Sequence, residues 1–164
     1  MYLLYLILIL FCLAVLYYLR HGAIFVPTGR QAVAAMVRLA QIKPGMKVVD
    51  LGSGDGRIVI AFAQAGVEAV GLEVNPILVW WSRWKIRQAG LPNAKIITKS
   101  FWSVDMADFD VDVVVVFGMT HIMEKLQEKL WRELKPGSLI ISNIFRFPNQ
   151  TPIQEEGSLR VYRR

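Results

Sequence analysis

A glycine-rich turn in the first half of the chain is the first feature that could do chemistry. The segment DLGSGDGR, residues 50–57, follows a β-branched pair and continues into an apolar helical pattern. Its glycines stand at positions 52, 54 and 56, which gives the spacing G-x-G-x-G. A dinucleotide site needs its third glycine one residue later, where Arg57 stands, and a Walker loop needs a closing Gly-Lys-Ser/Thr. The sequence therefore argues against both phosphate-binding loops.

Acidic residues accompany this turn. Asp50 and Asp55 belong to it, and Glu73 follows Gly52 by 21 residues, at the end of a second predicted strand. A carboxylate in that position can accept hydrogen bonds from ribose hydroxyls. Three acids with Arg57 as the one nearby base would repel a phosphate and attract a cation. The pattern favours an adenosine ligand with a positive centre, and S-adenosylmethionine, which carries a sulfonium and an ammonium group, fits this description.

Short β-branched runs alternate with helical patterns along the rest of the chain. Helices are expected at residues 29–42, 57–65, 76–88 and 122–134, and strands at residues 47–51, 68–73, 94–98, 111–117, 138–143 and 159–162. Strands and helices in alternation predict an α/β fold, a Rossmann-like doubly wound and mostly parallel sheet of about six strands. Ligands of such sheets bind at the carboxyl ends of the strands, where the glycine turn lies.

The start of the chain is apolar. Residues 2–19 contain no charged side chain and are followed by Arg20 and His21. At ~1.5 Å per residue these 18 residues span roughly 27 Å, close to the ~30 Å thickness of the bilayer's hydrocarbon core. No basic region precedes them, which argues against a cleaved signal peptide. We predict one transmembrane helix as an anchor within residues 1–20, contacting the bilayer through residues 2–19, and a folded domain over residues 21–164.

Charge and cysteine content agree with this organisation. Basic residues follow the apolar segment, so the positive-inside rule places the domain on the cytoplasmic or matrix-equivalent side of the membrane. The one cysteine, Cys12, lies within the apolar segment, so we expect neither a disulfide framework nor a metal site. The net charge of +6 suits anionic lipid headgroups and RNA alike.

The motifs also carry a resemblance. DLGSGDGR with GLEVNP about 20 residues later resembles class I, seven-strand S-adenosylmethionine-dependent methyltransferases. Over about residues 25–162 the chain resembles a narrower family, the membrane-anchored protein lysine methyltransferases, whose members modify the ATP synthase c subunit and the ADP/ATP carrier. The segments that carry this resemblance are FVPTGRQAV, DLGSGDGRIVIAFA, VGLEVNPILVWWSRW, FWSVD, VVVFGMTHIMEKLQEKL and NIFRFPNQTP. The resemblance implies a protein-lysine N-methyltransferase that acts on a membrane-protein lysine at a membrane surface.

The resemblance further implies roles for single residues. Asp50 and the glycine turn would surround the methionine part of S-adenosylmethionine, and Glu73 would bind the ribose. The loop at residues 100–102 would flank adenine, although the family often has aspartate where this chain has Ser100. Phe117 would line the passage to the methyl acceptor. The implied cofactor-binding set is Asp50, Gly52, Ser53, Gly54, Gly56, Glu73, Asn75, Ser100, Phe101, Trp102 and Phe117.

No general base follows from the sequence. A lysine acceptor with a pKa of ~10.4 must lose its proton before it attacks, and burial in an apolar entrance lowers that pKa. Thr120 and His121, just after the fourth strand, are the weak catalytic candidates. A solvent-exposed position at the start of a helix is the alternative interpretation for His121.

Tryptophans 80, 81 and 84 lie among basic residues in one predicted helix. Packing of part of this set against the sheet is one interpretation, and an interfacial face that holds the domain against a bilayer is the other.

Other functions are weighed against lysine methylation. The sequence argues against a nucleic-acid methyltransferase, because residues 117–120 lack the Asn/Asp-Pro-Pro-aromatic motif and Cys12 is the only cysteine. A lipid, quinone or other small-molecule methyltransferase at the membrane is the enzymatic alternative. A non-catalytic sensor or scaffold for an adenosine ligand is the alternative outside enzymes.

Overall fold

The computed structural model describes residues 4–9 and 26–164. Residues 4–9 are helical, whereas most of the predicted anchor and the boundary at residues 20–21 lie outside the described residues. Among the helices of the described part, none combines the length and the apolar character that a membrane crossing requires. The anchor at residues 2–19 therefore stays a prediction.

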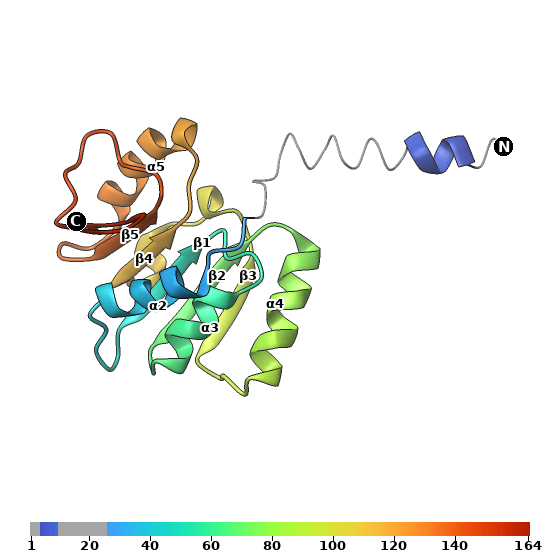
Figure 1. Cartoon of the computed structure of the whole chain (residues 1–164), viewed down its shortest axis with the longest axis horizontal. Helices are drawn as coiled ribbons and strands as arrows, with labels where there is room; N and C mark the ends of the chain where they lie inside the picture. Colours follow the sequence, from blue (N-terminus) through green and yellow to red (C-terminus); the bar gives the residue numbers. More distant parts are fainter. Residues whose placement is uncertain (1–3, 10–25) are drawn as a thin grey trace.

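A seven-stranded sheet in the order β3-β2-β1-β4-β5-β7-β6 forms the centre of the domain (Figure 1). β1 to β5 run parallel, β7 is antiparallel to β5, and β6 is antiparallel to β7. The strands are β1 Lys47–Leu51, β2 Glu68–Glu73, β3 Ala94–Thr98, β4 Val113–Val116, β5 Leu139–Asn143, β6 Gln154–Glu156 and β7 Leu159–Arg163. The mostly parallel α/β fold is confirmed.

The predicted number of about six strands is one too low. The missing strand is β6, whose three exposed residues are Gln, Glu and Glu. They offer neither apolar alternation nor β-branched side chains, so no strand pattern is present in the sequence. β6 forms because β7 offers it an antiparallel partner.

Helices cover both faces of the sheet. The helices are α2 Arg30–Leu39, α3 Arg57–Gln64, α4 Pro76–Gln88 and α5 Thr120–Glu133, with short 3₁₀ turns η1 Phe101–Ser103 and η2 Met106–Phe109. One buried cluster joins α2, α3 and α4 to one face, and a second joins η2 and α5 to the other. α2 ends three residues before its predicted end, because the chain turns at Gln41, where φ is +47°.

Parallel pairing brings the site residues to one edge. β1 pairs with β2 and β4, and β2 pairs with β3, all in parallel register. The carboxyl ends of these four strands therefore lie along one edge of the sheet. Each segment of the predicted site comes directly after one of these strands, so all of them lie at this edge. β4 is almost fully buried over its four valines, as expected of a central strand covered on both faces.

Candidate functional site

The turn after β1 has a backbone that glycine favours. Gly52, Gly54 and Gly56 have φ values of +82°, +53° and +77°, in the left-handed region that other residues rarely adopt. The backbone N–H groups of Gly52 and Ser53 both donate to the Leu72 carbonyl at 2.9 Å. These bonds hold the turn against the carboxyl end of β2.

Close packing fixes the turn from two further sides. A Cβ atom on Gly71 of β2 would lie 2.5 Å from Ser53 Oγ, and a Cβ atom on Gly56 would lie 2.8 Å from Ser82 Cβ of α4. Both distances are shorter than real contacts allow. Gly71 and Gly56 therefore let β2 and α4 approach the turn, which makes α4 part of its wall.

Asp50 carries a buried carboxylate at this turn. Its exposed fraction is 3%, and its Oδ2 atom has no hydrogen-bond partner; the same is true of the nearby Ser53 Oγ. Burial, then the charges of Glu73 and Asp55, raise the pKa of Asp50 to about 8. An orphaned carboxylate oxygen of this kind would be stabilised by a cationic group such as an ammonium. This is the feature of the site that fits S-adenosylmethionine best.

Glu73 organises the backbone around it. Its Oε2 accepts a hydrogen bond from Gly54 N, and its Oε1 accepts from Val74 N and Asn75 N, all at 2.8 Å. A carboxylate offers about four acceptor positions, and three are in use. Glu73 therefore joins β2 to the glycine turn, and its predicted binding of both ribose hydroxyls would require the Gly54 bond to be exchanged or shared.

Asp55 does not contribute the open negative charge that the sequence suggested. It pairs with Arg57 Nε at 2.9 Å and with Lys85 Nζ of α4 at 2.8 Å. Burial alone would raise the pKa of Asp55, but the hydrogen bonds from Arg57 and Lys85 outweigh it and lower the pKa to about 2. The interpretation of three convergent acids is wrong in this respect. Lys85 was missed because it is 30 residues distant in the sequence.

The segments after β2 and β3 take the expected places at the edge. Asn75 caps α4, which begins where the sequence predicts, and accepts hydrogen bonds from Ile77 N at 3.0 Å and Leu78 N at 3.4 Å. Ser100 Oγ accepts from Trp102 N at 3.3 Å and opens η1. The Phe101 and Trp102 rings lie 4.7 Å apart between centroids, which forms an aromatic wall on this side.

The segments after β4 and β5 meet through aromatic side chains. Phe117 contacts Phe145 edge to face, with centroids 5.8 Å apart and an interplanar angle of 90°. Phe145 N donates to Asn143 O at 2.9 Å, which closes a γ-turn around Ile144 at φ +70°. A β-branched residue with this φ is a strained backbone position. No role for Ile144 or Phe145 was evident from the sequence, although NIFRFPNQTP contains both.

The two weak catalytic candidates lie at the surface. Thr120 and His121 are exposed in the first turn of α5, next to the carboxyl end of β4. This exposure matches the solvent-contacting alternative for His121, and a catalytic role for either residue stays a prediction. Over residues 4–9 and 26–164, no group of three or more His, Cys, Asp and Glu side chains could hold a metal ion.

Comparison with known proteins identifies the family of the chain. The model of the ANTKMT methyltransferase domain matches residues 50–154. The chain is 42% identical over 134 residues to the ATP synthase c subunit lysine N-methyltransferase of Rattus norvegicus, covering 81% of this chain and 61% of that protein. It is 34% identical over 131 residues to a protein-lysine N-methyltransferase of Saccharolobus islandicus (strain REY15A), covering 78% of this chain and 80% of the relative.

A solved structure is similar over most of both chains. The RNA methyltransferase from Salinibacter ruber, in complex with S-adenosyl-L-homocysteine, superposes with a TM-score of 0.75 at 30% identity and covers 84% of this chain and 92% of its own. The rat protein is longer than the matched region, so this chain spans about three fifths of its length.

Proposed function

The chain belongs to the family of ANTKMT methyltransferase domains, and from this premise we propose that it transfers a methyl group from S-adenosylmethionine to a lysine of a membrane protein. The observation that carries the cofactor assignment is the glycine turn beside the buried, unpartnered Asp50 Oδ2. S-adenosyl-L-homocysteine bound to the Salinibacter neighbour supports the same ligand class.

The residues at the carboxyl ends of the strands would each contact a different part of the cofactor or of the acceptor lysine. Asp50 and the turn would hold the methionine end of the cofactor, Glu73 the ribose, and Phe101 with Trp102 the adenine. When bound, the cofactor supplies an electrophilic methyl group. Phe117 and Phe145 would form an apolar entrance that strips water from the acceptor lysine and lowers its pKa. Most of the rate would then come from alignment of the reactants.

Relatives with printed substrates support the acceptor class. The rat relative is named for a lysine of the ATP synthase c subunit, a membrane protein. The archaeal relative, which this chain covers over most of its length, is also named a protein-lysine methyltransferase. Together with the apolar residues 2–19, these names support a domain that is anchored beside its substrate, with the domain on the cytoplasmic or matrix-equivalent side.

Transfer of labelled methyl groups tests the proposal. Native membranes are incubated with the full chain and methyl-labelled S-adenosylmethionine, and protein, lipid and RNA are separated before acid hydrolysis of the protein. We expect label in methylated lysine. The matched control is Asp50→Asn, which keeps the side-chain shape and should lower the incorporation. Since the Salinibacter neighbour is described as an RNA methyltransferase, label confined to RNA, or to lipid, would overturn the lysine assignment.

A further inference from the structure

A buried stripe and an exposed apolar stripe lie on opposite sides of α4. The inner stripe, Val79, Ser82 and Ile86, is buried against the sheet. The outer stripe is Ile77, Trp80, Trp81 and Trp84, with exposed fractions of 69%, 64%, 45% and 46%. Both follow the spacing of three and four residues that places side chains on one face of a helix. Val79 and Ile86 occupy the position against the sheet in place of the three tryptophans, and of the basic and aromatic set it is Arg83 that contacts β3.

The three indoles form one continuous surface. Trp80 and Trp81 have ring centroids 6.4 Å apart, and Trp81 and Trp84 have centroids 5.5 Å apart. Isolated exposed apolar residues are ordinary, but a contiguous exposed patch of large side chains marks a contact with another body. α4 lies at the outer end of the sheet beside β3, so this surface faces away from the domain (Figure 1).

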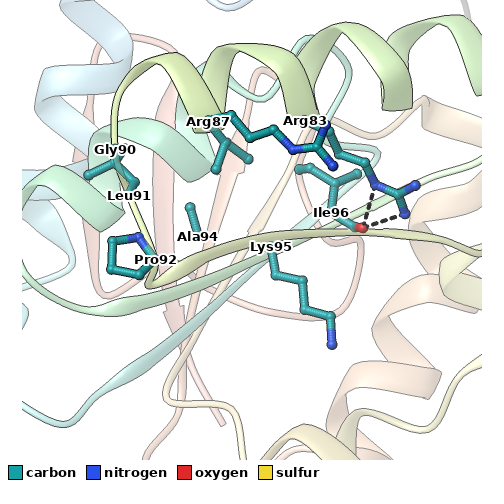
Figure 2. A pocket seen from close by; sticks show the side chains of 9 residues that line it. Arg83, Arg87, Gly90, Leu91, Pro92, Ala94, Lys95 and Ile96 are labelled. Carbon is teal, nitrogen blue, oxygen red and sulfur yellow. Dashed lines mark hydrogen bonds between the residues drawn. The ribbon is translucent and has the colours of Figure 1, made fainter.

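Basic residues flank the outer stripe. A groove of about 770 Å³ between α4 and β3 is lined by Arg83, Arg87 and Lys95 together with apolar residues (Figure 2). Arg83 donates to Ile96 O through Nε at 3.2 Å and through Nη2 at 2.8 Å, which fixes it at the edge strand. Arg87 is exposed and lies one helical turn beyond Trp84, whereas the exposed Lys95 points away from α4 (Figure 2). Indoles bordered by arginine match the chemistry of a bilayer interface with anionic headgroups.

The chain enters the domain next to α4. Arg57 NH1 donates to Thr28 O at 2.8 Å, Arg57 pairs with Asp55, and Asp55 pairs with Lys85 of α4. The ten residues from Arg20 to Gly29 can span at most ~35 Å. If residues 2–19 cross the bilayer as predicted, the point of entry and the outer stripe are both held within reach of the lipid surface.

We propose that the outer stripe of α4, with Arg87 at its border, is a membrane-contact surface that inserts its indoles into the interface of an anionic bilayer. This contact would set the orientation of the strand ends relative to the lipid. This proposal concerns the contact with lipid and does not depend on the identity of the methyl acceptor.

Quenching by brominated lipid tests this contact on the full chain. All five tryptophans belong to residues 80–131, so tryptophan fluorescence does not report on the N-terminal segment. The chain is reconstituted into vesicles of equimolar phosphatidylcholine and phosphatidylglycerol, with or without bromine on the acyl chains, and no protein substrate is present. We expect the brominated vesicles to quench most of the emission of Trp80, Trp81 and Trp84, and W80Q/W81Q/W84Q to lose that quenching.

A second variant keeps all the indoles. R87Q should reduce the quenching in vesicles that contain phosphatidylglycerol but not in pure phosphatidylcholine, since it removes charge alone. Emission that bromine leaves unchanged while the chain sediments with vesicles would overturn the proposal and favour a protein partner or a second copy on this face. A chain that stays out of the vesicle fraction would overturn it as well.

Discussion

The buried Asp50 side chain, which we expect to bind the ammonium group of the cofactor, destabilises the ligand-free fold when it is ionised. Its pKa is raised to about 8, far above the ~3.9 of an unfolded chain. Because the folded state holds the proton more tightly, this group stabilises the fold most below pH 4. That contribution is lost as the pH rises towards 8. We expect the ligand-free chain to lose several kcal/mol of stability over this range, since each pKa unit corresponds to about 1.4 kcal/mol.

The Asp50→Asn variant removes this ionisation with little change of shape. Thermal unfolding between pH 5 and 9 should show a flatter profile and a higher midpoint at pH 8 than the original chain. Calorimetry with S-adenosylhomocysteine should show binding weakened by about 10- to 100-fold, as for the loss of a charged hydrogen bond of about 1.5–3 kcal/mol. An unchanged pH profile would contradict the buried ionisation, and unchanged affinity would contradict the ammonium contact.

Some features of the site could be predicted from the sequence, and others depend on the fold. The glycine turn after β1 and the start of α4 follow from local sequence rules, and the structure has both at the predicted positions. Glu73 was placed at the end of β2 but not as an acceptor for three backbone amides, because that geometry depends on how the glycine turn folds back. The pairing of Asp55 with Lys85 needs α4 to pack beside the turn, and no local pattern contains that information.

At the scale of elements, a nearly buried ion pair on α5 joins this helix to the segment that connects η1 and η2. Lys129 Nζ lies 2.5 Å from Glu133 Oε2 and donates to Val104 O at 2.6 Å. Met106 N donates to Glu133 at 3.2 Å. Burial opposes the ionisation of Glu133, but the hydrogen bonds from Lys129, Met106 and Arg132 outweigh it and lower its pKa.

Glu133→Gln should therefore destabilise the domain by about 3 kcal/mol at pH 7, because it leaves the buried Lys129 charge without its partner. A lowered carboxylate pKa stabilises the fold above the unfolded value, and this contribution is lost as the pH falls through the folded value. The difference between the variant and the original chain should thus shrink in urea unfolding below about pH 4. Glu128→Gln, on the exposed side of α5, is the matched control and should stay within about 0.5 kcal/mol. Equal losses in both variants would contradict the role of the pair.

The boundaries of helices and strands were predictable where glycine, proline or a capping residue marks them. β2 and α4 match their expected ranges, since Gly66, Asn75, Pro76 and Gly90 bracket them. β6 was missed because its pairing depends on β7 and not on its own residues. The exposed tryptophans of α4 show the converse limit: helical spacing identifies a face, but only the fold decides which of two apolar faces turns inward.

At the scale of the whole molecule, the two buried clusters draw on residues from Val33 onward. The described part of the chain thus has a buried core of its own, and we expect it to fold without the apolar N-terminal residues, whose predicted task is to hold the domain at a membrane. Tethering a domain to the surface that carries its substrate raises its effective concentration, and gains of about 10²–10⁴ in apparent affinity are typical of such linkage.

Deleting residues 1–20 separates the two tasks. We expect the shortened chain to bind S-adenosylhomocysteine with the affinity of the full chain by calorimetry, because no site residue is removed. Its initial rate of lysine methylation on intact membranes should fall by at least about 10-fold at low enzyme concentration. Detergent-solubilised membranes are the control, since both chains lose the advantage of the tether there and should react at similar rates. A shortened chain that methylates intact membranes as fast as the full chain would refute the anchor's role.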